Sequence, residues 1–291
     1  MSTIALKDIT ITPVIEQLRC TDFKVMEFFP ALTKELLDEN RAWLEPAFLD
    51  PANGGLILCV QSFVIKTPHH NILIDSCVGN HKPRTARPFW HMLDSDRFET
   101  SLRATGLGFA DIDYVMCTHL HGDHVGWNTR LDNGRWVPTF PNAKYVMTDR
   151  ELAYWTQREK DDPSACPWIT DSVLPIVAAR REQVVKSDFA LDDAVRLVPT
   201  PGHTIDHFSV LVGRSGRDAF ITGDMIHSPL QGKYPEMGMR VDYDSAQAGA
   251  TRRKVFERHC DADTLFFLSH FPAPSTGRVR RWGEGYRFVA A

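Results

Sequence analysis

Three histidines and one aspartate lie within six residues of this chain, directly after the apolar run 114–117. That run predicts a buried strand, and a strand that ends in a short loop presents side chains from a rigid edge. His119 and His121 are two residues apart, so they point the same way on an extended segment. Asp123 and His124 follow a glycine that allows the chain to turn toward a second point nearby. Imidazoles and carboxylates suit zinc, iron, manganese or cobalt, so the spacing predicts two neighbouring metal positions. The alternative, a surface turn that is rich in histidine, is rare by composition alone.

Three later apolar segments each end close to one further candidate ligand. These ligands are His203 after 194–199, Asp224 after 219–222 and His270 after 264–268. A packed sheet can bring such loop residues together at a rigid site. Five histidines and two aspartates are too many for one tetrahedral zinc, but they suit two metals with open positions and one shared carboxylate. A closed structural zinc site would favour cysteine ligands instead.

The composition predicts a globular chain with a sizeable core, because 43% of its 291 residues are hydrophobic. The net charge of −4 does not favour a nucleic-acid partner. The first residues lack a basic segment followed by an apolar one, so we expect no signal peptide, and no apolar run reaches the length of a membrane span. The six cysteines are scattered without a Cys-x-x-Cys pair, which favours buried thiols in a reduced, cytoplasmic setting.

Strands and helices alternate along the sequence, which predicts an α/β fold. We expect a single domain over 1–291, with two halves at about 1–165 and 166–291 that divide at a polar break. The predicted strands are 9–17, 56–66, 71–75, 114–117, 143–147, 194–199, 208–212, 219–222 and 264–268, with a hairpin over 127–141 that turns at 132–134. The predicted helices are 89–105, a segment from 148 or 149 to 158, and 245–260.

Further residues are candidates for supporting the metal site or for lining a substrate pocket. Asp75 ends a predicted strand and could orient the metal loop or cap a turn, and Thr204 and His207 could orient the loop of His203. The predicted pocket lies in loops that flank the ligands and comprises Phe89, Trp90, Trp127, His227, Leu230 and Tyr234. The alternative for its aromatic members is ordinary core. The aromatic segment 24–49 is likewise core, a pocket wall or a dimer contact.

The whole ligand pattern resembles that of metallo-β-lactamase-fold hydrolases. The motifs that carry the resemblance are His-x-His-x-Asp-His after a strand, then Gly-His-Thr, Thr-Gly-Asp and Ser-His at the ends of later strands, with Ile-Leu-Ile-Asp at 72–75 upstream. The resemblance runs from about residue 55 to the C-terminus. It implies a four-layer αβ/βα sandwich, in which two mixed sheets pack face to face with helices outside. Cys77 is a departure, because the family usually has glycine at that position.

The same resemblance assigns each ligand to a metal. The first metal would be bound by His119, His121 and His203, the second by Asp123, His124 and His270, and Asp224 would bridge both. The segment 277–289 and the layout Gly-Asp-Met-Ile-His at 223–227 are similar to the methyl parathion hydrolase and lactonase-like group.

This resemblance implies a dinuclear hydrolase that acts on small neutral esters, lactones or organophosphotriesters. A hydroxide held between two divalent metal ions would attack the substrate, and Asp123 or Asp224 would accept or relay a proton. The ions would be zinc, with manganese, iron or cobalt as alternatives. We expect a small-molecule substrate, no nucleic-acid or membrane partner, and a homodimer by analogy.

Two other classes of function remain open. One is a different hydrolase on the same fold, such as a glyoxalase II-type thioesterase, a β-lactamase or a nuclease. A nuclease should carry a basic stripe, which this sequence does not show. The other class is non-hydrolytic, either a flavodiiron-like oxidoreductase or a binding module. His121 stands where the di-iron oxidoreductases usually have glutamate, and a binding module would be expected to lose ligands.

Overall fold

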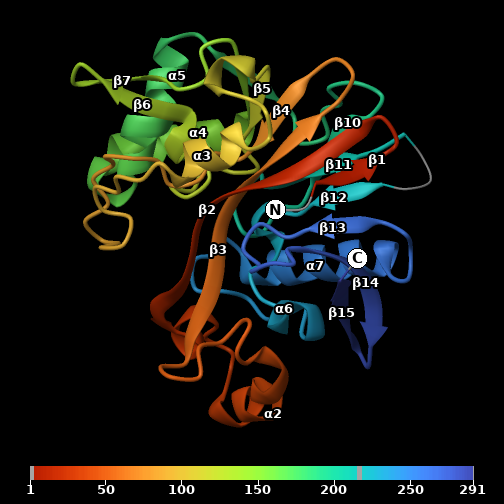
Figure 1. Ribbon diagram of the computed structural model, residues 1–291. Coiled ribbons are helices and arrows are strands. Elements are labelled where there is room, and N and C mark those ends of the chain that lie inside the picture. Colours follow the sequence, from red (N-terminus) through yellow and green to blue (C-terminus); the bar gives the residue numbers. More distant parts are fainter. Residues whose placement is uncertain (1–2, 215–217, 291) are drawn as a thin grey trace. The chain divides into compact units, whose positions relative to one another are not determined.

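The computed structural model describes residues 3–214 and 218–290, which form strands and helices in a mixed α/β fold (Figure 1). The chain divides into two compact units. Unit 1 comprises Met1–Gln17 and Val60–Lys186, and unit 2 comprises Leu18–Cys59 and Ser187–Ala291. The chain passes between units within strands β2 (Ile9–Lys24) and β3 (Gly55–Lys66), and again after Lys186. The single domain with halves that divide near residue 165 stays a prediction.

A seven-stranded mixed sheet has the order β1-β2-β3-β4-β5-β8-β9. The remaining strands of this sheet are β1 (Ile4–Leu6), β4 (Asn71–Ile74), β5 (Tyr114–Met116), β8 (Lys144–Thr148) and β9 (Glu182–Val185). Strands β4, β5, β8 and β9 are parallel, and β3 pairs with β4 in the antiparallel sense. Val115 and Met116 are fully buried, as are Tyr145 to Met147, which is typical of parallel strands covered on both faces. Loops that follow such strands are rigidly anchored places for ligands.

The described part of unit 1 also contains three α-helices and a hairpin. The helices are α3 (Arg97–Arg103), α4 (Asp149–Asp161) and α5 (Leu174–Ala178). The hairpin consists of β6 (Thr129–Asp132) and β7 (Arg135–Pro138), and Asn133 and Gly134 between them have φ values of 48° and 76°. Two consecutive positive φ values are what a type I′ hairpin turn requires, so the predicted turn at 132–134 is confirmed. Phe98 and Leu102 of α3 belong to the apolar core of this unit.

Unit 2 is built on a six-stranded mixed sheet with the order β10-β11-β12-β13-β14-β15. These strands are β10 (Val195–Pro199), β11 (Phe208–Val212), β12 (Ala219–Ile221), β13 (Leu265–Phe267), β14 (Thr276–Trp282) and β15 (Gly285–Ala290). Helix α7 (Ser245–His259) lies along this sheet (Figure 1), where Phe256 packs near Phe266. The parallel pair β12 and β13 again ends in loops that carry candidate ligands.

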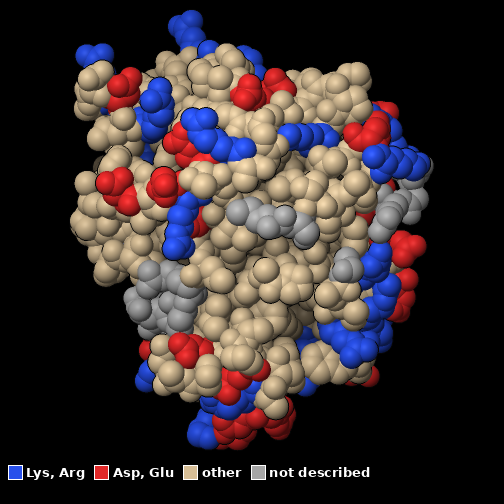
Figure 2. All heavy atoms as spheres, viewed as in Figure 1, with Lys and Arg blue, Asp and Glu red and all other residues tan. Residues whose placement is uncertain are grey.

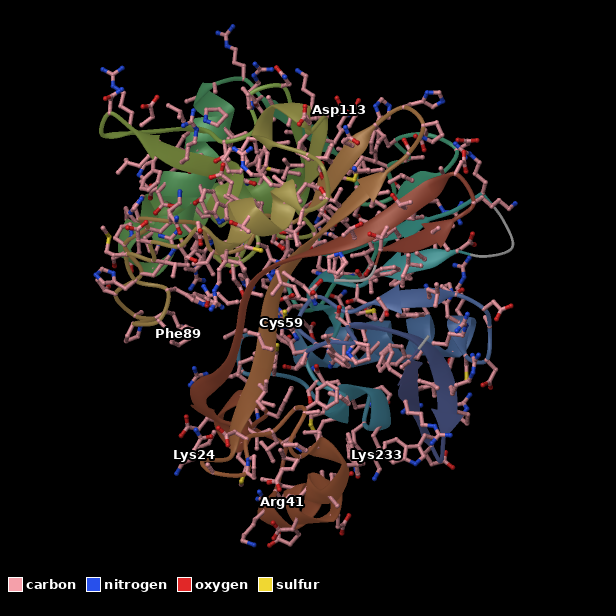
Figure 3. The ribbon with its side chains drawn as sticks, viewed as in Figure 1. Lys24, Arg41, Cys59, Phe89, Asp113 and Lys233 are labelled. Carbon is pink, nitrogen blue, oxygen red and sulfur yellow. The ribbon has the colours of Figure 1, made fainter. Side chains whose placement is uncertain are left out.

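The aromatic N-terminal segment contributes core to unit 2. Helices α1 (Val25–Phe28) and α2 (Lys34–Leu44) share an apolar cluster with α6 (Leu230–Lys233) and with Met237 and Met239 beyond it. Lys233, labelled in Figure 3, reaches over the ring of Trp282 and donates to Asn40 of α2. The segment 25–44 is therefore anchored to the chain that follows Asp224.

The predicted helix over 89–105 is wrong in its first half. Only Arg97–Arg103 is helical, and turns occupy the preceding residues. Met92 has a φ of 51°, which a right-handed helix excludes. Trp90 and Leu93 nevertheless pack against the core of unit 1, so turns position apolar residues whose spacing resembled a helical face. Among the described helices, none combines the length and the apolar character needed to span a bilayer.

Candidate metal centre

The loop after β5 carries four of the predicted ligands, which we call the first ligand set: His119, His121, Asp123 and His124. His119 and His124 are buried, whereas His121 and Asp123 are half-buried. The ring of His119 lies 4.6 Å from that of His121 and 4.2 Å from that of His124, measured between centroids. Three imidazoles and one carboxylate therefore converge within unit 1.

Asp75 joins the two ends of this loop. Its carboxylate accepts hydrogen bonds from the backbone N–H of Thr118 at 2.7 Å and from the Thr118 hydroxyl at 2.9 Å. The second oxygen also lies 2.8 Å from Nδ1 of His124. A carboxylate on Nδ1 fixes the tautomer, so Nε2 is the nitrogen of His124 that could bind a metal ion.

Helix α4 and the residues after it hold the loop from the other side. Glu151 accepts from the backbone N–H of Leu120 at 3.2 Å and from the indole N–H of Trp155 at 2.8 Å. Trp168 donates from its indole nitrogen to the carbonyl of Leu120 at 2.7 Å. A Cβ at Gly122 would lie 3.4 Å from the ring of Trp168, so the loop and this indole are in close contact.

Asp224 is the centre of the second ligand set, which comprises His203, Asp224 and His270 in unit 2. Oδ1 of Asp224 lies 2.9 Å from Nε2 of His270, and Oδ2 lies 3.3 Å from Nε2 of His203. The Nε2 atom of His227 also lies 2.9 Å from Oδ2. All of these side chains are buried, so a single carboxylate faces three imidazoles away from solvent.

Each ligand histidine of this set has its other nitrogen held by an oxygen. Nδ1 of His203 donates to Asp242 at 2.9 Å, and Nδ1 of His270 donates to the carbonyl of Cys59 at 2.9 Å. Cys59 lies on β3, where Figure 3 labels it. This arrangement directs Nε2 of both rings toward Asp224.

His207 has a different part in the site. Its Nε2 accepts the backbone N–H of Asp224 at 2.9 Å, so a neutral ring carries its proton on Nδ1 and donates to the hydroxyl of Thr200 at 2.8 Å. With both nitrogens engaged, His207 holds the Asp224 backbone. Thr204 is buried in the loop after His203.

The donor set fits divalent metal ions. Buried imidazoles with one nitrogen fixed and the other aimed at a carboxylate are the arrangement of histidine and aspartate metal sites. Without a cation the same groups must share protons. Burial lowers the pKa of His227 to about 4, against the attraction of Asp224. Burial also opposes protonation of His203, but its bonds to Asp224 and Asp242 outweigh burial and raise its pKa to about 9. The group Asp224, His227 and His270 is itself a possible set of ligands.

The six predicted pocket residues are placed differently from one another. His227 lies against Asp224, and its ring meets that of Phe28 edge to face at 6.0 Å. Trp127 is buried in the core of unit 1, where it stacks on Phe98. Leu230 is buried, and the Tyr234 hydroxyl accepts from Asn40 at 3.1 Å.

Phe89 and Trp90 lie on the loop between β4 and α3, which Figure 3 locates by its Phe89 label. Of the six residues, the structure brings His227 directly to a ligand.

Two residues that support the candidate ligands from a distance have no counterpart among the residues expected from the sequence. Asp242 holds His203, and Glu151 holds the backbone of Leu120. Neither residue belongs to a local pattern with the ligand that it supports. Position 77 was marked in the sequence, because Cys77 stands where the family usually has glycine. The structure gives the reason for that glycine: the φ of Cys77 is 49°, in the left-handed region that glycine adopts most readily.

The chain belongs to the metallo-beta-lactamase superfamily, whose family model matches residues 60–270. An N-acyl homoserine lactonase of Bacillus cereus is 26% identical over 121 residues, which are 42% of this chain and 41% of the relative. The beta-lactamase-like protein 2 homolog of Drosophila melanogaster is 34% identical over 119 residues, which are 40% of this chain and 34% of the relative. The matched segment thus spans about two fifths or less of these relatives.

Two solved structures resemble the chain over nearly its full length. The hydrolase AbOPH of the beta lactamase superfamily aligns with a TM-score of 0.80 and 22% identity, covering 99% of this chain and 96% of the other. AidC, a dizinc quorum-quenching lactonase, aligns with a TM-score of 0.80 and 19% identity, covering 100% and 97%. The predicted fold class is therefore confirmed, and the chain has a metallo-hydrolase fold with lactonase homologues.

Proposed function

We propose that this protein is a dinuclear metallohydrolase in which both ligand sets bind one pair of divalent cations. His119, His121 and His203 would hold the first cation, Asp123, His124 and His270 the second, and Asp224 both. The observation that carries the proposal is that the two carboxylate oxygens of Asp224 face different histidines. One carboxylate oxygen faces His203, a ligand of the first cation, and the other faces His270, a ligand of the second.

Bound divalent cations lower the pKa of water, so that hydroxide is available near neutral pH, and they polarise the oxygen of the attacked group. The side chains supply the positioning. Asp75, Asp242 and the carbonyl of Cys59 fix the tautomers of the ligand histidines. Asp123 is half-buried with Oδ2 3.8 Å from Nε2 of His124, and this oxygen is the acceptor that we assign to the proton of the attacking water.

Small neutral substrates are favoured, with lactones first and esters and organophosphotriesters next. N-acyl homoserine lactonases are among the relatives and structural neighbours. The net charge of −4, and the acidic side chains beside basic ones on the face drawn in Figure 2, favour a small molecule over nucleic acid. The proposal includes zinc as the resident metal, a homodimer as the assembly and the cytoplasm as the location.

Elemental analysis of the purified protein, paired with hydrolysis assays, tests the proposal. The panel would contain an acyl-homoserine lactone, a γ-lactone, an aryl ester, paraoxon, a thioester and a β-lactam. We expect about two metal ions per chain and lactone, ester or triester turnover that a chelator abolishes and added metal restores. Turnover of only the thioester or the β-lactam would keep the metal site and replace the substrate class. No stoichiometric metal after reconstitution would refute the proposal.

Replacing Asp224 with Ala tests the shared carboxylate. Removal of both oxygens should release at least one metal ion and lower kcat/KM by more than about 100-fold, beyond the loss expected for an outer hydrogen-bond partner. Asp263→Ala is the control, because Asp263 is exposed and pairs only loosely with Arg278 at 3.6 Å. Full activity and metal content in Asp224→Ala would rule out the bridging assignment.

A further inference from the structure

Glu16 is a buried carboxylate on β2, more than 100 positions before the first ligand set in the sequence. It accepts hydrogen bonds from the backbone N–H of Val78 at 2.9 Å and of Gly79 at 3.2 Å. A third bond comes from the indole N–H of Trp127 at 2.7 Å. The carboxylate therefore connects two segments, the 75–79 loop after β4 and the 124–128 loop, which begins with the last residue of the metal motif. Unit 1 contains all of these residues.

The two loops lie in close contact. Three backbone hydrogen bonds join them. The N–H of Gly126 donates to the carbonyl of Cys77 at 2.8 Å, and the N–H of Trp127 donates to the carbonyl of Ser76 at 2.8 Å. The N–H of Ser76 donates to the carbonyl of His124 at 2.7 Å. A Cβ at Gly79 would lie 2.6 Å from the carbonyl carbon of Gly126. Such an approach leaves little room for either loop to move without the other.

The 75–79 loop is held in an unfavourable backbone conformation. Asp75 and Cys77 have φ values of 57° and 49°, and Gly79 has a φ of 77°. Residues other than glycine keep such angles only where surrounding contacts enforce them. The bonds to the amides of Val78 and Gly79 are contacts of this kind, and Asp75 at the start of the loop is the residue that faces His124.

We propose that Glu16 is a positioning residue for the first ligand set. By joining the two loops it holds Asp75 against Nδ1 of His124, and so aims Nε2 of His124 at the metal. The effect should be strongest for the cation that His124 binds. This inference rests on the proposed function, because it assigns His124 to a metal.

Stepwise metal titration at pH 8 tests the inference in Glu16→Ala and Glu16→Gln. The pH is chosen because burial raises the pKa of Glu16 to about 7, although its three N–H donors oppose that rise. Glu16→Ala should bind one of the two cations about 10-fold to 100-fold more weakly, the range for loss of an outer partner. Glu16→Gln retains an acceptor for part of the contact and should show a smaller loss. If Glu16→Ala fails to fold, Glu16→Gln decides.

Ser101→Ala is the matched control. The hydroxyl of Ser101 accepts the backbone N–H of Ile15, the neighbour of Glu16 on β2, at 2.9 Å and is buried. This variant should lose thermal stability but bind both cations with unchanged affinity. Equal metal affinities in both Glu16 variants and the wild type would overturn the inference.

A second readout separates this inference from the proposed function. In metal-free protein, the ¹⁵N-edited NMR signal of the His124 Nδ1–H should shift in Glu16→Ala, because the ring loses its fixed contact with Asp75. Wild-type protein that binds no stoichiometric metal would refute the proposed function. The NMR signal would still decide the role of Glu16, and an unchanged signal would overturn it.

Discussion

At the scale of single residues, the oxygens behind the ligand histidines control the site. Asp75 faces His124 in unit 1, and Asp242 and the carbonyl of Cys59 face His203 and His270 in unit 2. Each places the proton on Nδ1, so that Nε2 is the nitrogen that would bind a metal ion in the proposed site. Three chemically similar partners thus come from three separate parts of the sequence.

Replacing Asp242 with Asn should lower the affinity for the cation that His203 is proposed to bind by about 10-fold to 100-fold. Burial raises the pKa of Asp242, but the hydrogen bond and charge of His203, together with the Met239 N–H and the charge of Arg252, outweigh burial and keep that pKa below its usual value. The neutral amide of Asn holds the imidazole less strongly. Metal competition titration gives the affinity. Asp244→Asn is the control, because its side chain still caps α7. An equal loss of metal affinity in this control would contradict the role of Asp242 in orienting His203.

Lys82 should give the stability of the protein a distinct pH dependence. It is fully buried, donates to Thr129 at 2.6 Å and lies 3.6 Å from the ring centroid of Trp136. Burial lowers its pKa to about 7, against the attraction of Asp171. Between pH 7 and the unfolded value of about 10.4, the unfolded chain binds more protons than the folded chain. The free energy of unfolding should therefore rise with pH, by up to about 1.4 kcal/mol per unit.

Urea unfolding of Lys82→Met between pH 7 and 9 checks this prediction. The variant should have a flatter dependence than the wild type, whereas Lys144→Met, at an exposed position, should keep the wild-type slope. Below pH 7 Lys82 adds no pH dependence, because both states are then protonated, and the cost of burying its charge is fully present. Identical slopes for all three proteins would show that Lys82 does not titrate in this range.

At the scale of elements, strands end in ligands and helices hold the loops that follow. Helix α4 fixes the first ligand set through Glu151, and α7 fixes the chain after Asp224 through Arg252. The guanidinium of Arg252 is buried and donates to the carbonyls of Met225, Pro235 and Met237 at 2.7–3.2 Å. The segment that it braces contains His227.

Arg252→Met should lower the free energy of unfolding by about 3 kcal/mol, because buried carbonyls lose their donors. Arg253 is the matched control on the next position of α7. It is partly exposed and pairs with the exposed Glu236, so Arg253→Met should change stability by less than about 1 kcal/mol. Denaturant unfolding measures both. Similar small losses would mean that the 225–237 segment does not depend on Arg252.

At the scale of the whole molecule, the proposed cations should couple the metal content of the protein to its stability. Ions that bind only the folded chain stabilise it by mass action, by about 4 kcal/mol for each site at a thousand times the dissociation constant. Chelation should therefore lower the thermal midpoint by about 5–10 °C for each cation removed, measured by calorimetry. Added zinc should restore the midpoint, and Asp224→Ala should respond less. An unchanged midpoint would contradict shared cations.

The fold class and the candidate ligands could be read from the sequence because their signals are local. His119, His203, Asp224 and His270 each follow a short apolar strand, and strand ends can be recognised from a few neighbouring residues. The turn at Asn133-Gly134 is local in the same way, since both residues tolerate positive φ. A local pattern also produced a wrong prediction. The apolar residues over 89–93 are spaced as on a helical face, but turns hold them in place.

The supporting residues depend on the tertiary structure. Glu16 contacts Trp127, Asp75 contacts His124, and Asp242 contacts His203 across long separations in sequence. No periodicity links such pairs, because the sheet topology and the burial of each carboxylate bring them together. The sequence thus contains the candidate metal ligands in short motifs, whereas the packed chain determines which nitrogen of His124, His203 and His270 is held by an oxygen. That choice follows from hydrogen bonds that form only when distant loops meet.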